Sequence, residues 1–151
     1  MQKTIISDAS CIILLDKIGE LILLKKLFGK ITTTKQIAKE FAKPLPDWFE
    51  IKEPKEKKFQ KILEATVDKG EASAIALALE SGDCLLIIDD LKGRKLARKL
   101  GLHLTGTLGI LVDAKQSGHI KSVKSILKKI KATDFRLTKE LEETILVKAK
   151  E

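Results

Sequence analysis

The stretch GEASAIALALESGDCLLIIDDLKGRKLARKLGL, residues 70–102, decides the fold class of this 151-residue chain. Residues 71–80 are rich in alanine and predict a helix that packs closely on a sheet. Residues 84–88 form a continuous apolar run between turn signals, which is typical of a strand buried on both faces of a parallel sheet. Residues 91–100 predict a second helix, which ends at Gly101. This order indicates an α/β fold with a central parallel sheet.

The rest of the chain continues the alternation of strands and helices. Strands or extended pieces are predicted at residues 3–7, 31–33, 48–52 and 103–105. Helices are predicted at residues 11–17, 20–28, 34–43, 55–67, 107–116, 122–131 and 138–148. Alternation of this kind predicts a parallel sheet with right-handed crossovers and with helices on both faces.

Two of these helices have a predicted apolar face. Phe59, Ile62 and Leu63 are expected on one face of the helix at 55–67. Leu137, Leu141 and Ile145 give the last helix an apolar stripe, which either packs on the domain or meets a partner. The length fits one domain over residues 1–151, with the C-terminal helices at about 122–149 packed on it or used for association.

Composition and charge exclude several classes of protein. Hydrophobic residues make up 44% and charged residues 33%, so a core and a solvated surface are expected rather than disorder. Asp8 interrupts the apolar opening, and no apolar run reaches membrane length, which predicts a cytoplasmic protein without a membrane helix or a secretion signal. Cys11 and Cys84 lie far apart without CxxC spacing, so we predict two buried free thiols.

The formal net charge of +8 favours binding to polyanions such as nucleic acid or anionic membrane surfaces. Much of the excess is lysine distributed along the chain, a pattern that is also typical of an ordinary solvated surface. The net charge alone therefore does not identify a function, and the positions of the acidic residues are needed to interpret it.

Acidic side chains follow two of the predicted strands at the point where each strand ends. Asp8 follows the first strand, and Asp89 and Asp90 follow the strand at 84–88. Because ligand sites of open parallel sheets gather outside the carboxyl ends of the strands, these three side chains should share one edge. Glu40 flanks the expected buried face of its helix, and Glu71 lies in the first turn of its helix.

Several carboxylates at one edge would repel one another, so such a set indicates a cation that neutralises them. Oxygen ligands favour Mg²⁺ or Mn²⁺ over Zn²⁺. Two such ions, roughly 4 Å apart, activate water and stabilise the leaving oxygen in phosphodiester hydrolysis. The basic surface would then attract a polyanionic substrate.

Each acid also has a purely structural interpretation. Asp8 can cap the following helix, and the pair at 89–90 can form a turn and an N-cap. Asp68 and Glu71 are spaced as in a capping box, and Glu71 complements the helix dipole. Glu40 can be a solvated helix residue. Spacing alone leaves these alternatives open.

Four motifs in this order resemble the PIN domain, in its VapC-like branch. They are IISDAS at residues 5–10, QIAKEF at 36–41, the stretch at 70–102 and TGTLGIL at 105–111. More narrowly, the chain is similar to small PIN-like proteins with GEA, DDxxGR and GTLG signatures, from residue 5 to about 118. The resemblance implies a three-layer α/β/α fold and Mg²⁺- or Mn²⁺-dependent ribonuclease activity, commonly as the toxin of a toxin–antitoxin pair.

The resemblance also assigns roles to individual residues. It implies a catalytic set of five acids, namely Asp8, Glu40, Glu71, Asp89 and Asp90. All of these except Glu40 would be metal ligands, and the choice within the pair at 89–90 is open. Ser10 would lie just behind Asp8, and Thr107 would line the site. As a hypothesis, three basic residues contact substrate phosphates, namely Lys92, Arg94 and Lys95.

The chain departs from the VapC-like pattern at three places. Many VapC-like proteins have Asp at the position of Glu71, a threonine shortly before the fourth acid and another Asp three residues after it. Here Ile87 or Ile88 and Gly93 occupy the last two places.

The expected partners are RNA, a cognate antitoxin and a second copy of the chain. One alternative function is a degenerate PIN-like module that binds nucleic acid or an antitoxin without turnover. Another is a phosphoacceptor domain of the receiver type, which expects an acidic pair after the first strand and a single Asp after a middle one. This chain has the reverse order.

Overall fold

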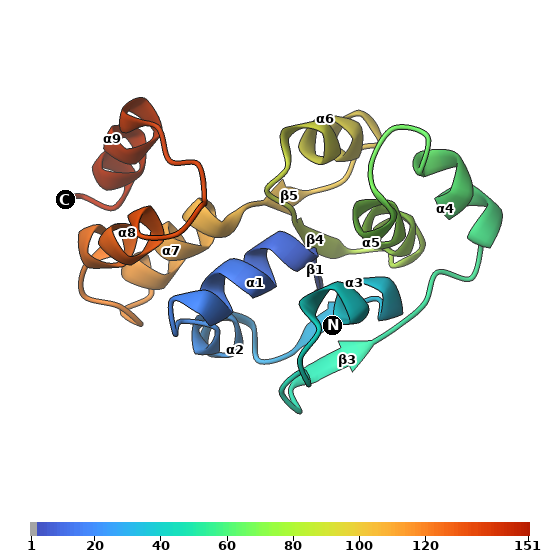
Figure 1. The fold of residues 1–151 in the computed structure, drawn as a ribbon, viewed down its shortest axis with the longest axis horizontal. Helices are drawn as coiled ribbons and strands as arrows, with labels where there is room; N and C mark the ends of the chain where they lie inside the picture. Colours follow the sequence, from blue (N-terminus) through green and yellow to red (C-terminus); the bar gives the residue numbers. More distant parts are fainter. Residues whose placement is uncertain (1–2) are drawn as a thin grey trace.

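A computed structural model describes residues 3–151 and shows a five-stranded parallel sheet between layers of helices (Figure 1). The strand order is β3-β2-β1-β4-β5, and every neighbouring pair is parallel. The strands are β1 Thr4–Ser7, β2 Ile31–Thr33, β3 Phe49–Ile51, β4 Cys84–Ile87 and β5 Leu104–Thr105. The three-layer α/β/α architecture and the parallel sheet that the sequence predicts are confirmed.

Each predicted helix is present in the part of the chain that the structure describes. The helices are α1 Ala9–Lys17, α2 Ile22–Phe28, α3 Lys35–Phe41, α4 Lys57–Leu63, α5 Lys69–Glu80, α6 Leu91–Lys99, α7 Thr107–Gln116, α8 Val123–Lys131 and α9 Lys139–Lys148. Thr34, Ser122 and Thr138 are N-caps, each accepting a hydrogen bond from the backbone N–H three residues later. Polar caps of this kind explain where these helices begin.

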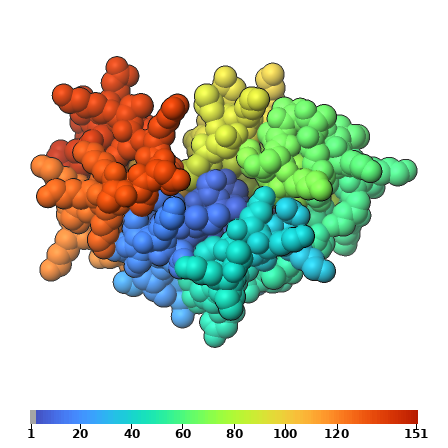
Figure 2. Space-filling model, viewed as in Figure 1, coloured from blue at the N-terminus to red at the C-terminus, as the bar shows by residue number. Residues whose placement is uncertain are grey.

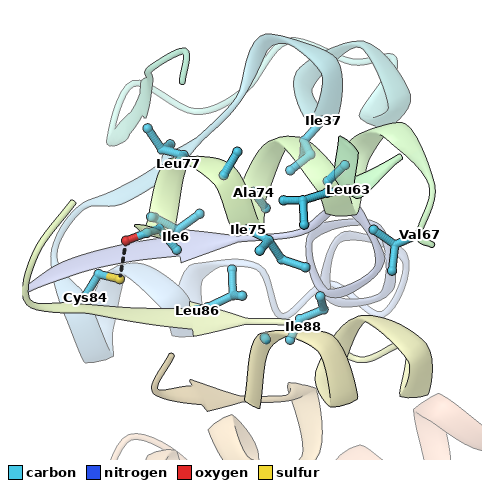
Figure 3. Close-up of a cluster of buried hydrophobic side chains, with 14 of the residues drawn as sticks. Ile6, Ile37, Leu63, Val67, Ala74, Ile75, Leu77, Cys84, Leu86 and Ile88 are labelled. Carbon is cyan, nitrogen blue, oxygen red and sulfur yellow. Dashed lines mark hydrogen bonds between the residues drawn. The ribbon is translucent and has the colours of Figure 1, made fainter. Parts of the chain in front are cut away.

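Alternating side chains of the strands bury both faces of the sheet. Ile6 and Leu86 point to the face covered by α5, where they pack with Ile75 in the cluster drawn in Figure 3. Ile5 and Ile87 point to the other face, into a second cluster built with α1, α2 and α7. Successive side chains of a strand point to opposite faces, so one short apolar run supplies both halves of the core.

The C-terminal helices α8 and α9 pack on α7 rather than on the sheet (Figure 1). Ile130 of α8 and Ile145 of α9 are buried in this third cluster. The predicted stripe on the last helix is buried only in part, because Ile145 is 6% exposed whereas Leu141 is 39% exposed.

The prediction of one apolar face on α4 is wrong. Only Leu63 is buried, whereas Ile62 is 67% exposed and Phe59 is 38% exposed. The helix ends at Leu63, and its main packing partner is α5. Neighbouring helix positions point about 100° apart, so a peripheral helix with one main packing partner buries a narrow row of side chains.

Cys11 and Cys84 are free and buried, as predicted. The Cys84 thiol donates a hydrogen bond to the Ala78 carbonyl oxygen at 3.5 Å (Figure 3). Within residues 3–151, no helix combines the length and the hydropathy needed to cross a bilayer.

Candidate metal centre

Asp8 lies where the carboxyl ends of β1 and β4 meet. Ser7 is paired with Ile87, so the residues that follow the two strands leave the sheet side by side. The two carboxylate oxygens of Asp8 accept backbone hydrogen bonds from Cys11 at 3.2 Å and from Asp89 at 3.3 Å. The first bond caps α1 and the second ties the ends of the strands together. Asp8 is therefore an N-cap and also lies at the edge that the strand argument predicted.

The Asp8 side chain is held in an environment that opposes its charge. It is only 2% exposed. Burial, followed by the charge of Asp89, raises the pKa of Asp8 from 3.8 to about 7, against the lowering effect of the two backbone hydrogen bonds. A buried carboxylate beside another carboxylate is stabilised by a nearby cation or by a proton.

A hollow of about 280 Å³ opens beside Asp8 at this edge of the sheet. Its polar lining comes from α1, α3 and the start of α5, and consists of Asp8, Ser10, Glu40, Asp68 and Glu71. Figure 2 shows the dark-blue start of α1 in a depression between cyan α3, the light-green start of α5 and yellow α6. The structure thus brings together three of the predicted acids and the predicted neighbour Ser10.

Asp68 is the acid that the sequence analysis did not place in the site. It is the N-cap of α5, and its Oδ1 accepts a hydrogen bond from the Glu71 N–H at 2.8 Å. The charge of Asp68 also raises the pKa values of Asp8, Glu40 and Glu71, although it is not the largest cause for any of them. The capping pattern of Asp68 could be recognised in the sequence, but the approach of α3 to the start of α5 could not be predicted from it.

Glu71 has an unpaired carboxylate oxygen in this cluster. Its Oε1 is buried, and no group of residues 3–151 donates a hydrogen bond to it. Burial is the largest cause that raises the pKa of Glu71 from 4.5 to about 9, followed by Asp68 and then Asp90. A buried acceptor without a donor costs free energy, so this oxygen is a candidate ligand for a cation.

Glu40 and Ser10 complete the hollow from two exposed positions. Although Glu40 is exposed as a residue, its carboxyl is partly buried. This partial burial, followed by the charge of Asp68, raises the pKa of Glu40, and a hydrogen bond with Gln36 opposes the shift. Ser10 is exposed in the first turn of α1. Both side chains therefore face solvent that can enter the hollow.

The two residues of the late Asp pair point to different neighbours. The Asp89 carboxylate accepts hydrogen bonds from the Thr107 N–H at 2.8 Å and from the Thr107 hydroxyl at 2.6 Å. The Asp90 Oδ2 accepts a hydrogen bond from the Gly93 N–H at 3.1 Å, which caps α6. Asp89 thus borders Asp8, whereas Asp90 borders Glu71. The turn-and-cap interpretation holds for Asp90, and Thr107 contacts Asp89 but is not among the residues that line the acidic hollow.

The three basic residues after this pair do not share one surface. The Arg94 guanidinium donates a hydrogen bond to the Ile88 carbonyl oxygen at 2.8 Å, which holds the side chain at the end of β4. Lys92 and Lys95 instead line a separate hollow of about 420 Å³ together with Lys99. Thr66 also lines this basic hollow and precedes Asp68 of the acidic hollow by two residues in the sequence.

The acidic side chains fit a hydrated hard cation rather than a closed metal cage. In the part of the chain that the structure describes, no three His, Cys, Asp or Glu side chains converge on one ion position. Mg²⁺ commonly keeps several waters and binds through one or two carboxylates, so it does not require such a group. The unpaired Glu71 oxygen and the buried Asp8 carboxylate are oxygen donors of the kind that Mg²⁺ and Mn²⁺ prefer.

Comparison with known proteins gives one match. A family model described as a PIN domain matches residues 4–151. Neither a curated protein nor a solved structure matches the chain. The matched range includes all the strands and helices that form the acidic hollow.

Proposed function

The chain belongs to the PIN domain family, and we propose that it is a Mg²⁺- or Mn²⁺-dependent endoribonuclease. PIN domains are typically nucleases. The observation that supports metal dependence is the buried, unpaired Oε1 of Glu71, whose side chain lines a hollow together with further carboxylates. A cation would supply the missing partner and offset the repulsion.

The proposed roles follow from where each acid lies. Asp8, Glu71 and one or both of Asp89 and Asp90 would hold the metal, which when bound activates water and neutralises charge on the phosphate. Glu40 reaches the hollow from α3, and its raised pKa makes it a stronger base for a proton from water. Thr107 keeps Asp89 in place through two hydrogen bonds.

The proposed substrate path runs over α6. Lys92, Lys95 and Lys99 line one hollow beside the acidic site, where they would bind RNA phosphates. Arg94 has further N–H donors besides the one bound to Ile88, and its predicted phosphate contact remains a proposal.

Replacing Lys92 and Lys95 together by Gln should weaken binding of single-stranded RNA and make it less salt-dependent. Loss of two phosphate contacts should reduce the slope of log affinity against log salt by about 1.4. Fluorescence anisotropy with EDTA present, between 50 and 200 mM salt, measures the slope. The matched control is Lys25→Gln with Lys26→Gln, an equal loss of charge on exposed positions of α2. Equal slopes for the two double variants would contradict the path over α6.

The proposed activity is tested first with the wild-type protein. Calorimetric titration should show specific Mn²⁺ binding, and RNA should be cleaved with Mn²⁺ but not with EDTA. Hydrolysis needs no covalent intermediate, so no RNA should remain attached to the protein. Absence of Mn²⁺ binding by the wild type would refute the proposed activity.

We further propose that the chain is a toxin with a cognate antitoxin and that it forms a homodimer. The support is the resemblance to the VapC-like branch, together with the partly exposed stripe on α9 for the dimer. Expression of the chain should arrest growth, and co-expression of a neighbouring small reading frame should relieve the arrest. A monomer in analytical ultracentrifugation would contradict the dimer.

A second candidate function is a PIN-like module that binds RNA or an antitoxin without turnover. It is favoured by the lack of a three-ligand group among residues 3–151 and by the structural hydrogen bonds of Asp89 and Asp90. This candidate expects salt-dependent RNA binding with no metal-dependent cleavage.

A further inference from the structure

The nine glycines of the chain fall into two groups. Five of them have a positive φ and have nothing within 4 Å of the place where a Cβ would stand, namely Gly19, Gly29, Gly82, Gly101 and Gly118. The other four lack a positive φ, and a Cβ would collide with a neighbouring side chain, namely Gly70, Gly93, Gly106 and Gly109. Glycine is required by the backbone conformation in the first group and by close packing in the second.

Three glycines of the second group pack against acids of the site. A Cβ on Gly93 would stand 2.6 Å from Oε1 of Glu71, the oxygen without a hydrogen-bond partner. A Cβ on Gly106 would stand 2.8 Å from Oδ1 of Asp89. A Cβ on Gly70 would overlap Oε2 of Glu40. Real Cβ atoms essentially never come within 3.0 Å of such neighbours.

These three glycines all lie at the N-terminal ends of helices. Gly70 and Gly93 lie in the first turns of α5 and α6, and Gly106 is the N-cap of α7. The N-terminal end of a helix is the favourable end for a carboxylate. A missing Cβ lets the carboxylate reach it.

We propose that Gly70, Gly93 and Gly106 are positioning residues that set the places of Glu40, Glu71 and Asp89 at the acidic hollow. This inference rests on the proposed function of that hollow. The helix positions of Gly70 and Gly93 do not require glycine, because alanine is better than glycine inside a helix by up to about 1 kcal/mol. A carboxylate oxygen stands against the space of the missing Cβ at all three glycines, together with Ile88 Cδ1 at Gly93 and Arg94 Nη1 at Gly106.

An added Cβ should move the carboxylates and leave the fold in place. Beside Gly93, the overlapped atoms are Oε1 of Glu71 and Cδ1 of the buried Ile88, both at the far ends of their side chains. They can shift without a movement of the backbone. A substitution here should therefore separate the effect on the site from the effect on stability.

Gly93→Ala should lower the affinity for Mn²⁺ by about 10- to 100-fold, as is typical for residues that position metal ligands. Its melting temperature without metal should be unchanged or higher than that of the wild type. The matched control is Gly109→Ala, in the first turn of α7, whose Cβ would stand 2.5 Å from the Thr105 hydroxyl oxygen instead of an acid. The control should retain wild-type affinity.

A double variant tests whether the effect passes through Glu71. Glu71→Asp shortens the side chain by one methylene and removes its overlap with the new Cβ, while the overlap with Ile88 stays, so Gly93→Ala should cost less affinity in that background than in the wild type. Equal losses in the two backgrounds would overturn the inference for Gly93.

A metal-free measurement separates this inference from the proposed function. The ¹³C resonance of the Glu71 carboxyl reports its titration, and in Gly93→Ala the midpoint should fall as the carboxyl moves toward solvent, while Gly109→Ala should leave it unchanged. An unchanged midpoint in Gly93→Ala would overturn the inference. A wild-type protein that binds no Mn²⁺ would refute the proposed function, and the titration would still decide the role of Gly93.

Discussion

Asp8→Asn is expected to abolish RNA cleavage while the protein remains folded. The carboxylate lies between the ends of β1 and β4, beside Asp89 and at the wall of the hollow. Replacing it with an amide removes the charge that would bind the cation, and the loss should exceed the roughly 100-fold effect of residues that only position ligands. Asn caps helices as well as Asp does, so the bond from the Cys11 N–H can persist.

The fold should tolerate this change within about 1 kcal/mol, the usual net value of one hydrogen bond. The bond from the Asp89 N–H is long at 3.3 Å, and its loss is offset by relief of the repulsion between the two carboxylates. Cleavage with Mn²⁺, calorimetry and circular dichroism measure the three effects. Asp47→Asn, at an exposed loop position, is the control for a general effect of charge. Cleavage by Asp8→Asn at the wild-type rate would refute the proposed site.

The edge that brings Asp8 and Asp89 together could be predicted because it depends on strand direction alone. Parallel strands end at the same edge, and the apolar run at 84–88 identified the second strand without knowledge of any contact. Glu40 and Glu71 required the family resemblance, since their meeting depends on how α3 packs on α5. The structure then places both in one hollow.

Asp68 and the packing glycines could not be identified from spacing. An Asp at an N-cap has two carboxylate oxygens, and the capping pattern in the sequence indicates only the one that caps the helix. A glycine in a first helical turn has no sequence signal that separates close packing from ordinary variation. Both features are set by tertiary contacts, which local patterns do not describe.

The different orientations of the basic residues after the Asp pair could be predicted from their spacing in the sequence. Lys92 and Lys95 are three positions apart and share a helix face, whereas Arg94 lies two positions from Lys92 and points elsewhere. The structure agrees, since both lysines line the hollow along α6 and Arg94 binds the Ile88 carbonyl. Helical periodicity thus separates the two kinds of basic residue.

Without metal, the free energy of unfolding is expected to fall as pH rises from about 4 to about 9. The pKa of Asp8 is raised from 3.8 to about 7 and that of Glu71 from 4.5 to about 9, mainly by burial. Within this window the folded protein retains protons that the unfolded chain has already released. Stability therefore decreases with pH, the reverse of the usual effect of salt-bridged carboxylates.

A bound divalent ion should reverse this pH dependence. Metal ligands must be deprotonated, so Mn²⁺ binding competes with protons at Asp8 and Glu71 and its affinity should rise with pH. The rise should approach about tenfold per pH unit for each proton released. Binding to the folded state alone stabilises it, so saturating Mn²⁺ should raise the melting temperature more at pH 8 than at pH 5.

Glu71→Gln identifies which group produces the upper part of this window. The amide does not titrate, so the metal-free melting temperature should depend less on pH well above 7, where Asp8, with a pKa of about 7, has largely lost its proton. Calorimetry in buffers of different ionisation enthalpy should count fewer protons released on Mn²⁺ binding than for the wild type. Glu80→Gln, at the exposed end of the same helix, is the control. If the wild type and Glu71→Gln show the same pH dependence, the unpaired oxygen of Glu71 is not the group that couples protons to the cation.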